Sequence, residues 1–166
     1  MVGISCTSRA QLPENIPHAQ DPKFDKVIIN TLDFSIPVIS VDQLKQKEGE
    51  FILLDARERK EYEVSRIPGA KWVGYDDFDL SRVKDIDKDK PVLLYCSIGY
   101  RSEKIGERLK AAGFSNVYNL YGSIFEWANK GYPVEDMNGK PVKKLHAYNW
   151  MWGKWVDDEK VEKVYK

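Results

Sequence analysis

One short stretch of the sequence brings together residue types that support nucleophilic chemistry. Cys96 follows the apolar run 91–95 and precedes the helix-like stretch 103–112, which places a thiol between a strand end and a helix start. Free backbone N–H groups and the positive end of a helix favour a thiolate over a thiol. An ordinary cysteine has a pKa near 8.5, whereas such surroundings lower the pKa to roughly 3.5–7.5. We therefore predict that Cys96 is a nucleophile; the alternative is a buried structural cysteine.

The residues that follow Cys96 complete the candidate site. Gly99 lets the backbone curl, so that several N–H groups can converge on one sulfur atom. Arg101 adds a fixed positive charge, although its alternative is a solvent-exposed place at the helix start. The candidate loop consists of Cys96, Ser97, Ile98, Gly99, Tyr100, Arg101 and Ser102.

Strand-like and helix-like stretches alternate along the middle of the chain. The continuous apolar runs 51–54 and 92–95 are typical of strands covered on both faces. Ser40 with Gln43, and Ser123 with Glu126, have the spacing of capping boxes that begin helices. Further strands are expected at 71–73 and 116–120, and further helices at 58–64, 76–83 and 103–112. The pattern predicts an α/β fold with a mostly parallel central sheet and helices on both faces.

Asp55 and Cys96 each follow a predicted buried strand. Because function gathers at the carboxyl ends of parallel strands, we expect the two residues to line the same crevice. We interpret Asp55 and Arg57 as supporting residues, with Asp55 orienting a loop or an arginine near the site. The alternative for Asp55 is a purely local role at a strand end and helix cap.

The composition excludes several classes of protein. The chain has 166 residues, enough for one domain with extensions, and its 42% hydrophobic content is typical of a globular core. The 26 basic and 26 acidic residues balance, so no overall charge attracts nucleic acid or an anionic membrane. No apolar run approaches the ~18 residues of a transmembrane helix. His18 and His146 are isolated in the sequence, so we expect neither a metal site nor a cofactor.

Besides Cys96, the chain has one other cysteine, Cys6, and two cysteines are too few for a disulfide framework. A small residue before a cysteine near the N-terminus is typical of a bacterial lipoprotein acceptor site. The apolar segment of about 7–15 residues that belongs to such a signal is missing. We expect a cytoplasmic protein in which Cys6 is a free thiol. The alternative is a lipoprotein of the bacterial envelope, anchored through Cys6 after its signal has been trimmed.

At the Cys96 loop the chain resembles the rhodanese-like family of single-domain sulfurtransferases, and the resemblance extends over about residues 38–134. Three further motifs occur in the family's order: Asp55-Ala56-Arg57 with Glu61-Tyr62 (D-x-R…E-[YF]), Ile67-Pro68-Gly69-Ala70 (I-P-G-A), and Gly122 to Trp127 with Gly131-Tyr132-Pro133 (G-G-x-x-x-W…G-x-P). Arg66 departs from the family, which often has histidine before I-P-G-A. That position is not the nucleophile.

The resemblance implies a three-layer fold and a double displacement through Cys96. The thiolate takes the outer sulfur of thiosulfate or a persulfide donor, and cyanide, a thiol, a thioredoxin-like protein or another sulfur-acceptor protein then removes it. The resemblance also implies that backbone N–H groups of residues 97–101 stabilise the sulfur anion and that Arg101 attracts the anionic donor. A sulfur carrier or interaction module without turnover is the alternative. Phosphatase or arsenate reductase activity is less favoured, because the phosphatase signature has one more residue between cysteine and arginine than the four found here.

We expect three parts around this resemblance: an N-terminal extension (1–35), a rhodanese-like domain (36–135) and an aromatic-rich C-terminal extension (136–166). In the first, we expect an irregular arm, with residues 27–29 as a short strand or a segment packed on the domain. In the last, residues 137–141 are expected as a linker or hairpin and residues 157–166 as a short helix or a disordered end. The tryptophans of 142–156 are expected to pack onto the domain, with a lid over the site and a partner anchor as alternatives.

Overall fold

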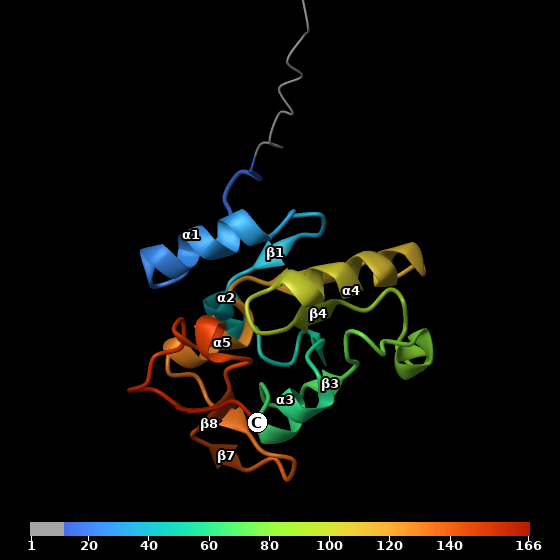
Figure 1. Ribbon diagram of the computed structural model, residues 1–166. Coiled ribbons are helices and arrows are strands. Elements are labelled where there is room, and N and C mark those ends of the chain that lie inside the picture. Colours follow the sequence, from blue (N-terminus) through green and yellow to red (C-terminus); the bar gives the residue numbers. More distant parts are fainter. Residues whose placement is uncertain (1–11) are drawn as a thin grey trace, which may run out of the picture.

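The fold is centred on one five-stranded parallel sheet (Figure 1). The structure, a computed structural model, describes residues 12–166. The strands are β1 Val38–Ile39, β2 Ile52–Asp55, β3 Lys71–Trp72, β4 Val92–Tyr95 and β5 Val117–Leu120. Their order is β1-β5-β4-β2-β3, and every pairing is parallel, with Leu54 opposite Leu94 in the β2–β4 pair. The central strand β4 is buried along its whole length.

Helices cover both faces of the sheet, which confirms the predicted α/β class. They are α1 Pro22–Thr31, α2 Val41–Gln46, α3 Arg59–Val64, the 3-10 helix η1 Leu80–Val83, α4 Tyr100–Ala111, α5 Ser123–Asn129 and α6 Trp150–Gly153. In β4, Leu93 and Tyr95 face a hydrophobic core shared with α1, α2 and α5, whereas Val92 and Leu94 face a second core shared with α4. The continuous apolar run in β4 follows from this arrangement, because successive strand side chains point to opposite faces.

One of the two predicted capping boxes is confirmed. The Ser40 side chain accepts a hydrogen bond from the backbone of Gln43, whose own side chain accepts one from the Ser40 backbone. The box at Ser123 is wrong, because Gly122 occupies the cap position of α5 in a left-handed conformation and Ser123 is the first helical residue. The Ser123 hydroxyl instead donates to Leu120 O at 3.0 Å and accepts from the Cys96 backbone at 3.1 Å.

The N-terminal extension contains a helix that the sequence prediction missed. Residues 12–21 are irregular, as expected, but residues 27–29 belong to α1 and do not form a strand. Asp21 caps this helix, and Pro22 begins it, a position where its missing N–H has no cost. Phe24 and Ile28 are fully buried, so the expectation of a segment packed on the domain is confirmed.

The C-terminal extension is more ordered than predicted. β6 Val134–Glu135 and β7 Pro141–Val142 form an antiparallel hairpin around residues 137–141, one of the two predicted outcomes. β8 Lys144–His146 pairs in parallel with β9 Glu162–Val164, so the predicted short helix or disorder for residues 157–166 is wrong. Trp155 stacks on Phe24 of α1 with ring centroids 5.7 Å apart. Both extensions therefore contribute to the same core, and the division into three parts remains a proposal.

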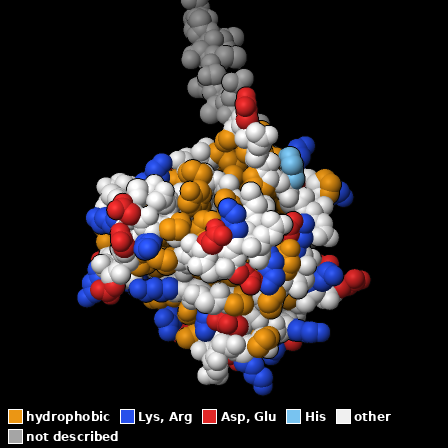
Figure 2. All heavy atoms as spheres, turned by 180° about the vertical axis from the view of Figure 1, so that it is seen from behind, with side chains coloured by type: hydrophobic (Ala, Val, Ile, Leu, Met, Phe, Trp, Pro, Cys, Tyr) orange, Lys and Arg blue, Asp and Glu red, His pale blue; other side chains and the backbone are white. Residues whose placement is uncertain are grey.

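The surface carries charges of both signs. Figure 2 shows acidic and basic side chains interspersed over the face that it displays, with hydrophobic groups between them. Within residues 12–166, no helix has the length and apolarity needed to cross a membrane. Cys6 and its suggested lipoprotein role lie outside the described residues.

Candidate active site

The Cys96 thiol lies at the carboxyl end of β4, in the turn that leads into α4. The side chain is only 1% exposed, and its sulfur accepts a hydrogen bond from the Gly99 N–H at 3.2 Å. Gly99 has a φ of 125°, a left-handed conformation that residues with a Cβ rarely adopt. The helix begins at Tyr100, directly after this turn and earlier than predicted, so the sulfur sits at its amino end.

The surroundings of Cys96 favour the thiolate. Burial alone raises the pKa of the thiol, because an apolar interior disfavours the charged form. The Arg101 charge and the hydrogen bonds from Ser102 and Gly99 outweigh burial, and together they hold the pKa of Cys96 below its ordinary value. A thiolate is the nucleophilic form of cysteine, so the site is prepared for covalent chemistry.

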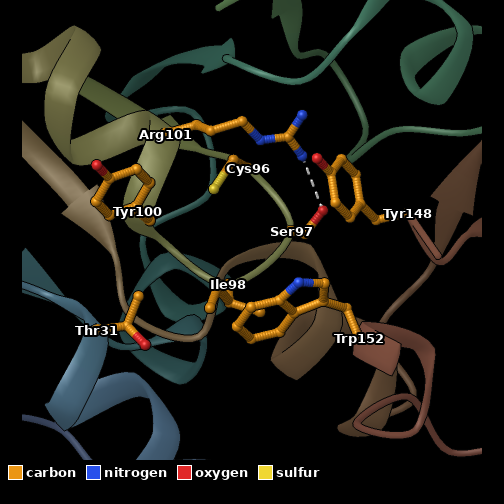
Figure 3. Close-up of a pocket in the computed structure, with 8 residues that line it drawn as sticks. All are labelled: Thr31, Cys96, Ser97, Ile98, Tyr100, Arg101, Tyr148 and Trp152. Carbon is orange, nitrogen blue, oxygen red and sulfur yellow. Dashed lines mark hydrogen bonds between the residues drawn. The ribbon is translucent and has the colours of Figure 1, made fainter. Parts of the chain in front are cut away.

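Arg101 is bound to a buried carboxylate that the sequence analysis did not single out as a site residue. The guanidinium Nη1 donates to Glu61 Oε2 at 2.6 Å, and Nη2 donates to Glu61 Oε1 at 2.9 Å. Nη2 also donates to Ser97 Oγ at 3.0 Å (Figure 3). The Arg101 charge lowers the pKa of Glu61 despite the opposing effect of burial. Glu61 belongs to the D-x-R…E-[YF] motif, and a buried arginine requires a carboxylate partner of this kind.

Asn119 of β5, which the sequence did not predict as a site residue either, holds the turn after Cys96 in place. Its Nδ2 donates to Gly99 O at 2.9 Å, and its Oδ1 accepts from Ser102 Oγ at 2.7 Å. Both Asn119 and Ser102 are fully buried. Ser102 therefore supports the loop from behind. Asn119 gives no signal in the sequence, because its role depends on the pairing of β5 beside β4.

A cavity of about 300 Å³ opens onto the Cys96 sulfur, which Figure 3 shows pointing into the space between the labelled side chains. Its walls are Thr31, Cys96, Ser97, Ile98, Tyr100, Arg101, Tyr148 and Trp152. Tyr148 and Trp152 come from the C-terminal extension and Thr31 from the N-terminal one. The tryptophan-rich segment thus packs onto the domain and also covers one side of the site.

Asp55 and Arg57 do not line this cavity. Both are fully buried, and Arg57 Nη2 donates to Asp55 Oδ2 at 2.6 Å and to Ser65 O at 2.7 Å. The Arg57 guanidinium lies 5.7 Å from the centre of the Tyr95 ring, directly before Cys96 in the chain. The pair therefore supports the end of β4 that leads into the Cys96 loop. Within residues 12–166, no group of three His, Cys, Asp or Glu residues has the arrangement of a metal site.

The fold and the Cys96 loop together define a rhodanese-like domain. The sequence profile of that domain matches residues 40–130, and the chain belongs to the rhodanese-like family. A rhodanese-like domain protein from Staphylococcus aureus is 28% identical, with a TM-score of 0.54 over 61% of this chain and 98% of that one. A thiosulfate sulfurtransferase from Pseudomonas aeruginosa is 26% identical, with a TM-score of 0.53 over 60% of this chain and 20% of that one.

The curated relatives include a sulfur carrier protein and a tRNA hydroxylase. The chain is 31% identical over 99 residues to the putative sulfur carrier protein YrkF of Bacillus subtilis, covering 58% of this chain and 53% of the relative. It is 30% identical over 131 residues to a tRNA uridine(34) hydroxylase of Yersinia pestis, covering 73% of this chain and 36% of the relative. The chain therefore spans about half or less of the relatives that it matches.

The Glu61–Arg101 pair predicts opposite pKa shifts in two variants. Arg101→Met removes a positive charge and raises the pKa of Cys96, whereas Glu61→Gln leaves the arginine uncompensated and lowers that pKa. Thiolate reactivity is present above the pKa and lost below it. As pH falls, Arg101→Met therefore loses its thiolate reactivity at a higher pH than the protein with the unaltered loop. Glu61→Gln keeps that reactivity to a lower pH.

The measurement is the pH dependence of iodoacetamide alkylation of Cys96, made in a Cys6→Ser background so that one thiol reports. Shifts of the same sign in both variants would show that structural damage, and not charge, controls the thiol.

Proposed function

We propose that the protein is a sulfurtransferase that carries sulfane sulfur as a persulfide on Cys96. The observation that carries the proposal is the Cys96 sulfur itself. It faces a cavity, accepts a hydrogen bond from Gly99 N–H at the start of α4, and has a lowered pKa. Such a thiolate attacks sulfur readily and is regenerated when an acceptor removes the transferred atom.

In the first step the Cys96 thiolate attacks the outer sulfur of thiosulfate. A new S–S bond forms to Cys96, the S–S bond of the donor breaks, and sulfite leaves with its electron pair. In the second step a nucleophile such as cyanide or a thiolate takes the terminal sulfur and restores the Cys96 thiolate. A persulfide donor enters the same sequence with a thiolate as the leaving group.

The loop supplies the electrostatic part of the reaction. Gly99 N–H and Ser102 stabilise negative charge on the Cys96 sulfur, and Arg101 adds a positive charge nearby. The family resemblance predicts that Arg101 offers its hydrogen-bond donors to an anionic substrate. Because both terminal nitrogens already bond to Glu61, we propose that Arg101 acts chiefly on the Cys96 thiolate and less on the donor.

A sulfur carrier without turnover is the second candidate. YrkF is described as a putative sulfur carrier, and its similarity to this chain favours a role in which Cys96 passes sulfur to one acceptor protein. In that case the acceptor is a thiol protein, such as a thioredoxin-like one, and small acceptors react slowly. We propose the enzyme first, because the open cavity admits small molecules.

Counting product equivalents separates these functions. The protein is mixed with excess thiosulfate and excess cyanide, and thiocyanate is measured per molecule of protein. Continuous release of many equivalents supports the enzyme, whereas a Cys96 that gains sulfur but releases thiocyanate only slowly supports the carrier. The Cys6→Ser variant serves as the control and is expected to match the unaltered protein. If Cys96 gains no sulfur by intact-protein mass and no thiocyanate is released with either thiosulfate or a persulfide donor, both proposals are contradicted.

A further inference from the structure

Part of the wall of the Cys96 cavity comes from the two extensions, and these wall residues lie outside the matched domain at 40–130. We propose that these walls select sulfur donors and acceptors with an apolar, planar organic group beside the reacting sulfur, in preference to small multiply charged oxyanions such as thiosulfate. The proposal rests on the sulfur transfer proposed above and names the substrate class of that same site.

The shape of the cavity supports an organic substrate. Its volume of about 300 Å³ equals the space of roughly ten water molecules. Ile98, Tyr148 and Trp152 give it an apolar and aromatic surface close to Cys96 (Figure 3). Pockets for organic ligands are typically lined in this way, with few polar groups to fix orientation.

Hydrogen bonds hold the backbone that carries the aromatic wall. The Tyr148 N–H donates to His146 Nδ1 at 3.1 Å, and the Trp152 N–H donates to Asn149 Oδ1 at 3.0 Å. Trp152 also packs against the hydrophobic core. The Arg101 guanidinium lies 5.0 Å from the centre of the Tyr148 ring, so both aromatic side chains have contacts that reduce the freedom they lose when a flat group binds.

The charges of the site do not favour a dianion. Among the described residues that line the cavity, Arg101 is the one with a full positive charge, and Glu61 forms two hydrogen bonds with it. The pair is close to neutral as a unit. A doubly charged ion that moves from water into such a cavity loses hydration free energy, and its attraction to the site offsets little of that loss. A donor with a single charge and an apolar body loses less hydration free energy, and it gains apolar contact with the aromatic wall.

Thiosulfonates provide the probe, because their general form R–SO₂–S⁻ carries one charge and a variable group R. The Cys96 thiolate attacks the outer sulfur, the donor S–S bond breaks, and the sulfinate R–SO₂⁻ leaves with the electron pair. Benzenethiosulfonate and methanethiosulfonate share the charge and the reacting atoms and differ in R.

The experiment compares the second-order rates at which these two compounds load Cys96, followed by intact-protein mass. The benzene-to-methane rate ratio is expected to fall about tenfold in Trp152→Ala, since the loss of an aromatic contact is worth about 1.4 kcal/mol. The two compounds release different sulfinates, but this difference is the same for every variant. It therefore cancels when the benzene-to-methane rate ratio of one variant is compared with that of another. Trp150→Ala is the matched control, because this nearby tryptophan is 80% exposed and lies outside the cavity.

Tyr148→Ala provides a second variant, since Tyr148 is 44% exposed and its loss disturbs the core less than the loss of Trp152. It is expected to lower the ratio in the same direction. If Cys96 loads normally but the ratio stays unchanged in both variants, the substrate class is wrong and sulfur transfer stands. If neither thiosulfonate nor thiosulfate loads Cys96, the proposed function itself fails.

Discussion

Replacing Cys96 with serine is expected to lower thiosulfate-to-cyanide turnover by about a thousandfold or more, on the scale seen when a covalent nucleophile is removed. A serine hydroxyl stays protonated at neutral pH and forms no persulfide. The change is nearly isosteric in a fully buried position, so the fold is expected to survive. Thiocyanate formation under steady-state conditions measures the effect.

The Cys6→Ser variant is the matched control for this loss. It removes the other thiol of the chain and is expected to keep full turnover. Comparable turnover in Cys96→Ser and the unaltered protein would remove Cys96 from the mechanism and leave the geometry of its loop without a catalytic role.

Replacing Arg57 with methionine is expected to destabilise the protein by about 3–5 kcal/mol, since it leaves a buried carboxylate without its partner. Asp55 and Arg57 are both fully buried, and three hydrogen bonds join their side chains. Urea unfolding followed by circular dichroism measures the free energy of unfolding.

Two controls show whether burial of the unpaired charge is the cause. Arg59→Met breaks the exposed Arg59–Glu63 pair, in which each side chain is about half exposed, and is expected to cost under about 1 kcal/mol. The double variant Asp55→Leu/Arg57→Met removes both buried charges and is expected to recover much of the lost stability. If the double variant is as unstable as Arg57→Met, the loss arises from packing and not from the stranded carboxylate.

The parts of the fold that sequence predicted are those set by local pattern. The apolar run of β4 reveals a strand covered on both faces, and Gly99 marks a turn before a helix. Cys96 follows from these two elements alone, because a thiol between them lies near free backbone N–H groups. Local pattern failed at Ser123, whose hydroxyl serves the Cys96 strand end and not its own helix.

The residues that sequence missed act through contacts between distant parts of the chain. Glu61 reaches Arg101 across forty positions, and Asn119 reaches Gly99 across twenty. Tyr148 and Trp152 enter the cavity wall only because the C-terminal extension folds back over the domain. Neither periodicity nor residue type predicts these long-range contacts, because the contacts depend on strand order and on the packing of both extensions.

The most direct test of Cys96 as a sulfur carrier is intact-protein mass after brief incubation with thiosulfate or a persulfide donor. We predict a gain of one sulfur atom, about 32 Da, that disappears on addition of cyanide and does not occur in Cys96→Ser. The same gain is predicted in Cys6→Ser. No gain with either donor, or a gain that persists in Cys96→Ser, would contradict a persulfide on Cys96.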